Sequence, residues 1–169
     1  LSVEALLRWD RAVEFNINTE NIIETIEKVG LTHELGYWVF DNACAQLEEW
    51  QEQGHLIESI SINVSAKQFH QKLFVNQVIS VIENYNLIPS QLTLELTEAV
   101  IIDDMVSLIE KLNKLKDYGV RISLDDFGTG YSSLAYLKHL PIDQLKIDKM
   151  FVHDISIESS SHHIVKTII

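Results

Sequence analysis

Five short runs of the chain alternate apolar and polar residues, and this alternation restricts the fold more than any other feature. The runs predict strands at Ser2–Trp9, Ile60–Ser65, Leu92–Thr97, Val120–Asp125 and Gln144–Asp148. Apolar residues at helical spacing predict helices at His33–Gln53, Val75–Tyr85, Met105–Tyr118 and Tyr131–His139. Strands that alternate with helices are typical of βαβ units and of a parallel sheet.

Each predicted strand has one apolar and one polar face, because side chains two positions apart lie on the same side of a strand. In Ile60–Ser65, for example, every second residue is Ser or Asn. A parallel strand covered on both faces would be continuously apolar. A polar inner face suits a closed barrel, so we predict an α/β fold of the TIM-barrel, (β/α)8, type. Such a barrel takes about 250 residues, so this chain of 169 residues is predicted to form an incomplete barrel of about five strands.

Several acids fall on the polar faces of these strands. They are Glu4, Glu95, Asp125 and Asp148, and Asn63 shares the face with them. Carboxylates that converge at the carboxyl ends of barrel strands cannot all ionise in a dry site unless cations neutralise them. Carboxylate and amide oxygens suit Mg²⁺ or Mn²⁺. The adjacent pair Asp125-Asp126 is able to bridge two ions ~3.5–4 Å apart.

Two basic side chains, Arg8 and Lys146, fall on the same face and are suited to holding a phosphate or a water. For any single acid the simpler explanation is a solvated surface position. Matching positions on five strands favour a site, because buried charges are rarely kept without partners or metals. The segment Asp125–Tyr131, DDFGTGY, is either a glycine-bearing loop that moves over a ligand or a tight strand-to-helix turn.

Composition excludes several classes of protein. The chain has 13 Lys and Arg against 25 Asp and Glu, and its net charge of −12 argues against a DNA-binding surface. Charged residues interrupt every apolar run long before about 18 residues, so direct membrane insertion is not expected. Cys44 is the only cysteine and is predicted to lie in the core, which fits a reducing, cytoplasmic setting.

Five ordered motifs resemble those of the EAL domain, a bacterial phosphodiesterase that linearises cyclic di-GMP. They are EALLRW from Glu4, SINVS from Ser61 with Gln68-Phe69 after it, LELTE from Leu94, LDDFGTGYSSL from Leu124 and PIDQLKID from Pro141. The resemblance covers essentially the whole chain.

The resemblance implies a role for each motif residue. The implied metal ligands are Glu4, Asn63, Glu95 and Asp125, with Asp126 on a second ion and Asp148 close by. Lys146 would hold the attacking water, and Asp126 and Glu98 complete the implied catalytic set. Arg8 and Leu6 would contact the substrate. Glu98 would anchor the loop Phe127–Ser133, which in the family often lies at a dimer interface, so a homodimer is expected.

The chain departs from the family pattern in three places. The stretch Asp10–Val29 has Arg11-Ala12 where the family usually has His-Pro, and it contains neither Gly nor Pro. The family's earlier strand with a Gln-Pro pair is absent. The chain also ends inside an apparent helix, His162–Ile169, before the family's later glutamate and glutamine motifs. We therefore interpret residues 1–169 as a single EAL domain that is truncated at both ends.

The predicted function is metal-dependent hydrolysis of cyclic di-GMP to linear pGpG in bacterial second-messenger signalling. One alternative is an EAL-like receptor or protein-interaction domain without turnover, which the altered Asp10–Val29 favours. The other is an enolase-type barrel enzyme with Mg²⁺ and a Lys base, which does not account for LDDFGTGYSSL. A sensor or diguanylate-cyclase (GGDEF) domain is expected in the parent protein, and any membrane anchor would come through such other domains.

Overall fold

The fold was obtained as a computed structural model that describes residues 1–12, 14–101, 105–127 and 137–148. The strands are β1 (Ser2–Ala5), β2 (Ser59–Val64), β3 (Leu92–Thr97), β4 (Arg121–Phe127) and β5 (Gln144–Ile147). The α-helices are α1 (Thr19–Val29), α2 (Thr32–Glu52), α3 (Ala66–Phe69), α4 (Phe74–Asn84) and α5 (Met105–Tyr118). Short 3₁₀ turns are η1 (Asp10–Ala12), η2 (Pro89–Gln91) and η3 (Glu98–Ile101).

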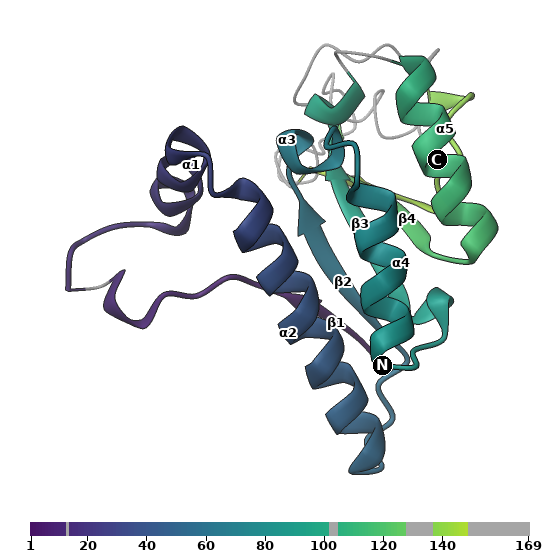
Figure 1. The fold of residues 1–169 in the computed structure, drawn as a ribbon, viewed down its shortest axis with the longest axis horizontal. Coiled ribbons are helices and arrows are strands. Elements are labelled where there is room, and N and C mark those ends of the chain that lie inside the picture. The colour runs from purple at the N-terminus through teal and green to yellow at the C-terminus, as the bar shows by residue number, and fades with distance from the viewer. Residues whose placement is uncertain (13, 102–104, 128–136, 149–169) are drawn as a thin grey trace, which may run out of the picture.

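The strands form one parallel sheet in the order β1-β2-β3-β4-β5, so each strand lies beside its neighbour in the sequence. Figure 1 shows α2, α4 and α5 gathered on one side of this sheet. The predicted fold, an incomplete α/β barrel of five parallel strands, is confirmed. No helix in the described part of the chain has the length and apolar content needed to cross a bilayer.

The core lies between the sheet and these helices, where the apolar strand faces pack. Ile62, Leu94 and Ile122 stand on three adjacent strands, and each is fully buried. Each such side chain contributes about 1.5–3 kcal/mol when it leaves water. Cys44 is also fully buried, as predicted, and burial, with a smaller effect of the Asp41 charge, raises the pKa of its thiol to about 12. The polar strand faces are therefore left on the opposite side of the sheet from the helices.

The first predicted strand is wrong in its length. β1 pairs with β2 only over Ser2–Ala5, and the chain then leaves the sheet as an arm, residues 6–12 and 14–17, that projects to the left in Figure 1. Apolar alternation continues past Ala5 in the sequence, but it cannot show where the hydrogen-bonded partner strand ends. The predicted strand Gln144–Asp148 is one residue shorter in the structure.

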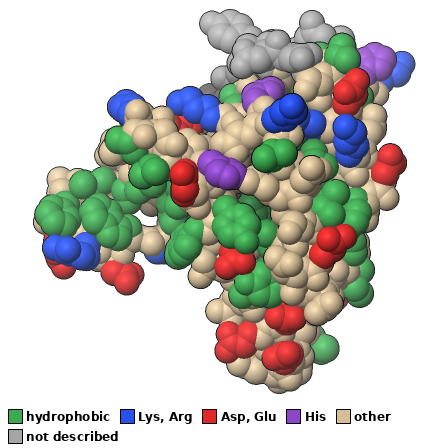
Figure 2. All heavy atoms as spheres, viewed as in Figure 1, with side chains coloured by type: hydrophobic (Ala, Val, Ile, Leu, Met, Phe, Trp, Pro, Cys, Tyr) green, Lys and Arg blue, Asp and Glu red, His purple; other side chains and the backbone are tan. Residues whose placement is uncertain are grey.

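The arm carries several apolar side chains in the open. Leu6, Trp9 and Phe15 are all exposed, and hydrophobic side chains gather on this projection in Figure 2. The rings of Trp9 and Phe15 stack with centroids 5.8 Å apart, and the Arg11 guanidinium lies 5.2 Å from the Phe15 centroid. These ring contacts hold the arm in a defined shape although little of it is buried.

Most predicted helices appear within a residue of their expected bounds, but α1 was missed. Its start is set by Asn18, whose side chain accepts a hydrogen bond from the Asn21 N–H at 2.8 Å. Its end is set by Gly30, which adopts φ 79° and donates its N–H to the Ile26 carbonyl. Both are ordinary capping signals, so the sequence contains the information for α1 although no helix was predicted there. The predicted helix Tyr131–His139 lies mostly outside the described residues.

Candidate active site

Strand register brings two of the predicted ligands together on the polar face. Asn63 of β2 lies directly opposite Glu95 of β3, and Ser123 of β4 continues the same row. Asp125 pairs with Thr97, one row closer to the carboxyl ends of the strands. The carboxyl end is where parallel barrels place their active sites, so the sheet itself positions these side chains.

Glu4 of β1 pairs with Ser61, one row closer to the amino ends of the strands, and its side chain reaches Asn63. The Asn63 amide donates a hydrogen bond from Nδ2 to Glu4 Oε1 at 2.8 Å. Asn63 therefore lies between two acids: it is hydrogen-bonded to Glu4 and stands beside Glu95 on the neighbouring strand. The strand register and this hydrogen bond bring Glu4, Asn63 and Glu95 close together, as the sequence predicted.

Lys146 of β5 supplies the positive charge at the centre of the cluster. Its Nζ lies 2.5 Å from Glu95 Oε1 and 3.8 Å from Asp125 Oδ2. Burial alone would lower the pKa of Lys146, but the hydrogen bond and charge of Glu95, with Asp125 and Glu4 beyond it, outweigh burial and raise that pKa. The side chain is therefore a firmly charged ammonium group.

Glu95 is the most deeply buried acid of the cluster. Only 2% of the residue is exposed, and Oε2, the oxygen that does not face Lys146, has no hydrogen-bond partner. A buried carboxylate oxygen without a partner is costly. The unpartnered Oε2 of Glu95 on the polar face therefore indicates that a cation or a hydrogen-bond donor binds there.

A bulge at the end of β4 sets the position of Asp126. The pairing of β4 with β5 shifts register between Leu124 and Phe127, and Asp126 adopts φ 53°, in the left-handed region. Its N–H donates to Asp125 Oδ1 at 2.9 Å. Burial, followed by the charges of Asp125 and Asp148, raises the pKa of Asp126. Such backbone geometry is uncommon outside Gly, Asn and Asp.

A groove of about 580 Å³ opens beside this cluster, and we call it the α1 groove. Asn63 and Asp126 line one part of it, Leu6 and Arg8 of the arm line another, and residues of α1, α2, α3 and the neighbouring strand ends form the rest. Arg8 is exposed and donates from Nη1 to the Leu7 carbonyl at 2.9 Å. The expectation that Arg8 reaches the site on a strand face is wrong, since β1 ends at Ala5. Arg8 and Leu6 reach the groove from the arm instead.

Glu98 lies immediately after β3, as the first residue of η3, and is buried. Its expected partner loop, Phe127–Ser133, lies outside the described residues except for Phe127. The anchoring role of Glu98 therefore stays a prediction. Phe127 itself is buried at the end of β4.

The donor set fits a divalent cation in its chemistry. It consists of carboxylate and amide oxygens, which Mg²⁺ and Mn²⁺ prefer, and it includes the unpartnered Glu95 Oε2. Among the described residues, no three His, Cys, Asp or Glu side chains lie close enough to hold an ion together. The Lys146 ammonium stands between Glu95 and Asp125 and balances charge that a cation would otherwise neutralise.

The sequence analysis did not predict the groove residues contributed by α1, α2 and α3. Thr19, Ile23 and Ile26 of α1, Leu35 and Gly36 of α2, and Gln68 of α3 all line the groove. The capping residues Asn18 and Gly30 would have predicted α1. Nothing local in the sequence places Gln68 beside Gly36, because 31 intervening positions separate them.

Comparison with known proteins identifies relatives of this chain. MucR of Pseudomonas aeruginosa, described as a bifunctional diguanylate cyclase/cyclic di-GMP phosphodiesterase, is 41% identical over 169 residues, which is 100% of this chain and 25% of MucR. The oxygen sensor protein DosP of Escherichia coli is 37% identical over 150 residues, 89% of this chain and 19% of DosP. The chain thus spans a quarter or less of these curated relatives.

A solved structure and a family model complete the comparison. The structure of the phosphodiesterase PaMucR in complex with c-di-GMP superposes with a TM-score of 0.87 at 40% identity, covering 99% of this chain and 71% of that one. The sequence model of the EAL domain matches residues 1–169. The chain therefore belongs to the EAL domain family.

Proposed function

We propose that the chain carries the active site of a metal-dependent phosphodiesterase that hydrolyses cyclic di-GMP to linear pGpG. The observation that carries the proposal is the contact of Lys146 with buried Glu95 and with Asp125, next to a groove that Arg8 enters. The names of MucR and of the PaMucR complex support the same substrate.

Arg8, Lys146 and Leu6 have separate roles in the proposed reaction. Arg8 binds a phosphate of the substrate through its guanidinium fork, which suits phosphate oxygens. Lys146, held by Glu95 and Asp125, orients the attacking water in line with the scissile P–O bond. Leu6 lies along the substrate as an apolar contact. Positioning and charge neutralisation account for most of the acceleration in phosphoryl chemistry.

We propose Mg²⁺ or Mn²⁺ at a two-ion site as the cofactor. The proposed ligands are Glu4, Asn63, Glu95, Asp125 and Asp126, with Asp148 close by. Bound divalent cations polarise a phosphoryl oxygen and lower the pKa of water. The unpartnered Glu95 Oε2 and the crowding of Asp125, Asp126 and Asp148, which raises the pKa of Asp126, support a cation at this place.

The proposed setting is a longer signalling protein in which sensor or diguanylate-cyclase (GGDEF) domains control this one. MucR is named as a bifunctional enzyme with a diguanylate cyclase activity, and DosP as an oxygen sensor. We further propose a homodimer and a cytoplasmic location, with Glu98 as the anchor of the loop that follows Phe127.

The decisive experiment is hydrolysis of cyclic di-GMP with Mn²⁺, read as pGpG on a column, with and without a chelator. Glu95→Gln should reduce turnover at least about 100-fold, since it removes a charge that holds Lys146. Glu110→Gln is the matched control, because Glu110 is an exposed acid on α5. Tight binding of cyclic di-GMP without product would overturn the enzyme and favour a receptor.

A further inference from the structure

Gln68 lies in the wall of the α1 groove, and no side chain or backbone group of the described residues holds its amide by a hydrogen bond. Only 8% of Gln68 is exposed, and it lines the groove. Its backbone N–H donates to Ser65 Oγ at 3.3 Å, but no hydrogen bond to its amide is found among the described residues. The amide therefore keeps its donor and its acceptor for a group that enters the groove.

Gly36 makes room for the amide. A Cβ atom at position 36 would lie 2.3 Å from Gln68 Nε2 and 2.6 Å from Cδ. Gly36 is itself buried inside α2, where glycine is otherwise unfavourable in a helix. The absence of a side chain at position 36 therefore keeps the Gln68 amide against the helix.

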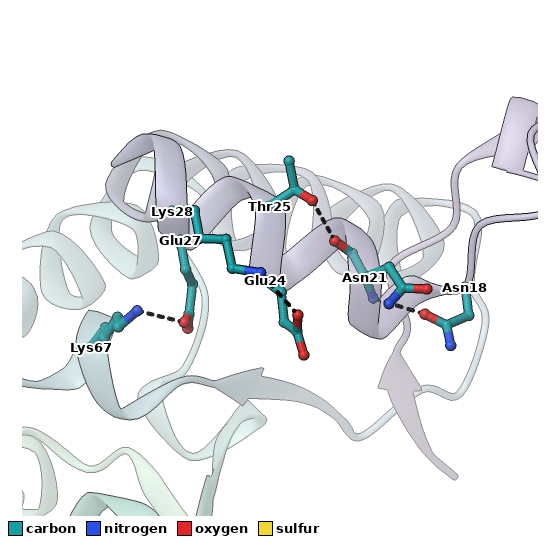
Figure 3. Close-up of polar contacts among 7 residues, drawn as sticks. All are labelled: Asn18, Asn21, Glu24, Thr25, Glu27, Lys28 and Lys67. Atoms are coloured by element: carbon teal, nitrogen blue, oxygen red, sulfur yellow. Dashed lines mark hydrogen bonds and ion pairs between the residues drawn. The ribbon is translucent and has the colours of Figure 1, made fainter.

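The surroundings of the amide suit a flat apolar ring. Ile23 and Ile26 of α1 line the groove on one side, and Leu35 and Val39 of α2 line it on another. α1 has no fully buried residue, so its apolar side is available to the groove. Figure 3 shows how α1 is held at this place, with Lys67 of α3 reaching Glu27 of α1 at 2.7 Å.

The other part of the same groove holds the polar groups of the proposed active site. Arg8, Asn63 and Asp126 line it together with Gln68. A ligand with a phosphate at Arg8 and a ring near α1 would therefore bring the edge of that ring toward the amide. This is the arrangement of a nucleotide.

We propose that Gln68, positioned by Gly36, binds the hydrogen-bonding edge of a guanine base of the substrate. The amide offers a donor and an acceptor side by side, which matches O6 and N1–H of guanine. The inference rests on the proposed function, since it takes cyclic di-GMP as the ligand. It adds a base-binding residue to the motif residues that handle the phosphate.

The test separates base binding from chemistry by using two substrates. Gln68→Leu should raise KM for cyclic di-GMP about 10- to 100-fold and leave kcat within about twofold. Hydrolysis of bis(p-nitrophenyl) phosphate, which has no base, should not change. Gln68→Glu should retain most of the guanine affinity, because a carboxylate accepts hydrogen bonds from guanine N1–H and N2–H. Gln53→Leu, at the exposed end of α2, is the matched control.

Gly36→Ala provides a second, independent variant. The atoms that the new methyl group would meet are the flexible end of Gln68, so the amide moves while the helix stays. KM for cyclic di-GMP should rise as in Gln68→Leu, with an unchanged circular dichroism spectrum. If the wild type hydrolyses cyclic di-GMP and both Gln68→Leu and Gly36→Ala keep its KM, the inference is overturned and the proposed function stays intact. A wild-type chain that turns over neither substrate and binds no cyclic di-GMP overturns both.

Discussion

Replacement of Lys146 by Met tests whether the charged cluster is held together as the geometry indicates. The change keeps most of the side-chain volume but leaves Glu95, which is 2% exposed, without its ammonium partner. At 2.5 Å and an effective dielectric constant of about 20, the gross attraction is about 7 kcal/mol. Desolvation of Lys146 and its lost side-chain entropy offset much of this.

The net cost follows from the burial of both partners. Removing one partner of a buried pair costs about 3–5 kcal/mol. The Lys146 side chain is 30% exposed, so water reaches Glu95 in the variant, and a cost at or just below the bottom of this range, about 2–3 kcal/mol, is expected. For a chain of this size the unfolding midpoint should fall by about 4–12 °C.

A double-mutant cycle isolates the pair. Urea unfolding in the presence of a chelator is measured for the wild type, Lys146→Met, Glu95→Gln and the double variant. Glu95→Gln removes the buried charge, so the double variant should be more stable than the sum of the two losses predicts, by about 1.5 kcal/mol or more. Lys28→Met is the matched control, because Lys28 pairs with Glu24 at 3.3 Å on the exposed side of α1, and should change stability by less than about 0.5 kcal/mol. Additive losses at Lys146 and Glu95 would refute the reasoning.

Three further changes test other parts of the structure. Leu94→Ala, at a fully buried position of the central strand β3, should cost about 3–4 kcal/mol in urea unfolding; a cost below about 1 kcal/mol would contradict the assigned core. Asn18→Ala removes the cap that accepts from the Asn21 N–H and should weaken α1 by about 1 kcal/mol, seen as faster amide exchange in α1 but not in α2. Burial alone would raise the pKa of Asp143, but hydrogen bonds from Lys116 and from the Ile122 N–H hold it below its ordinary value of 3.8. The Asp143 carboxylate therefore stabilises the fold above pH 3.8, and this stabilisation is lost as the pH falls through the folded pKa. Asp143→Asn should lower the unfolding midpoint at neutral pH and lower it by progressively less in acid. An equal loss at all pH values would contradict the assignment.

The alternation of polar and apolar residues predicted the parallel sheet and its two faces correctly. The reason is local and geometric, since the period of two in a strand decides the face of each side chain. Ile62, Leu94 and Ile122 entered the core for this reason, and Asn63 and Glu95 met on the other face. The same rule failed at Arg8, because a strand ends where its hydrogen-bonded neighbour ends, and the sequence of β1 does not contain that information.

Contacts between distant segments were decided by the tertiary structure alone. Lys146 reaches Glu95 because β5 and β3 flank β4, and the bulge in β4 turns the backbone of Asp126 into the left-handed region. Gln68 meets Gly36 because α3 packs against α2. The sequence by itself determined which residues carry charge, which face each strand side chain takes and the family to which the chain belongs. Only the folded chain decided which of these groups touch and which wall of the groove they form, because those distances depend on strand register and helix packing rather than on the period of any one segment.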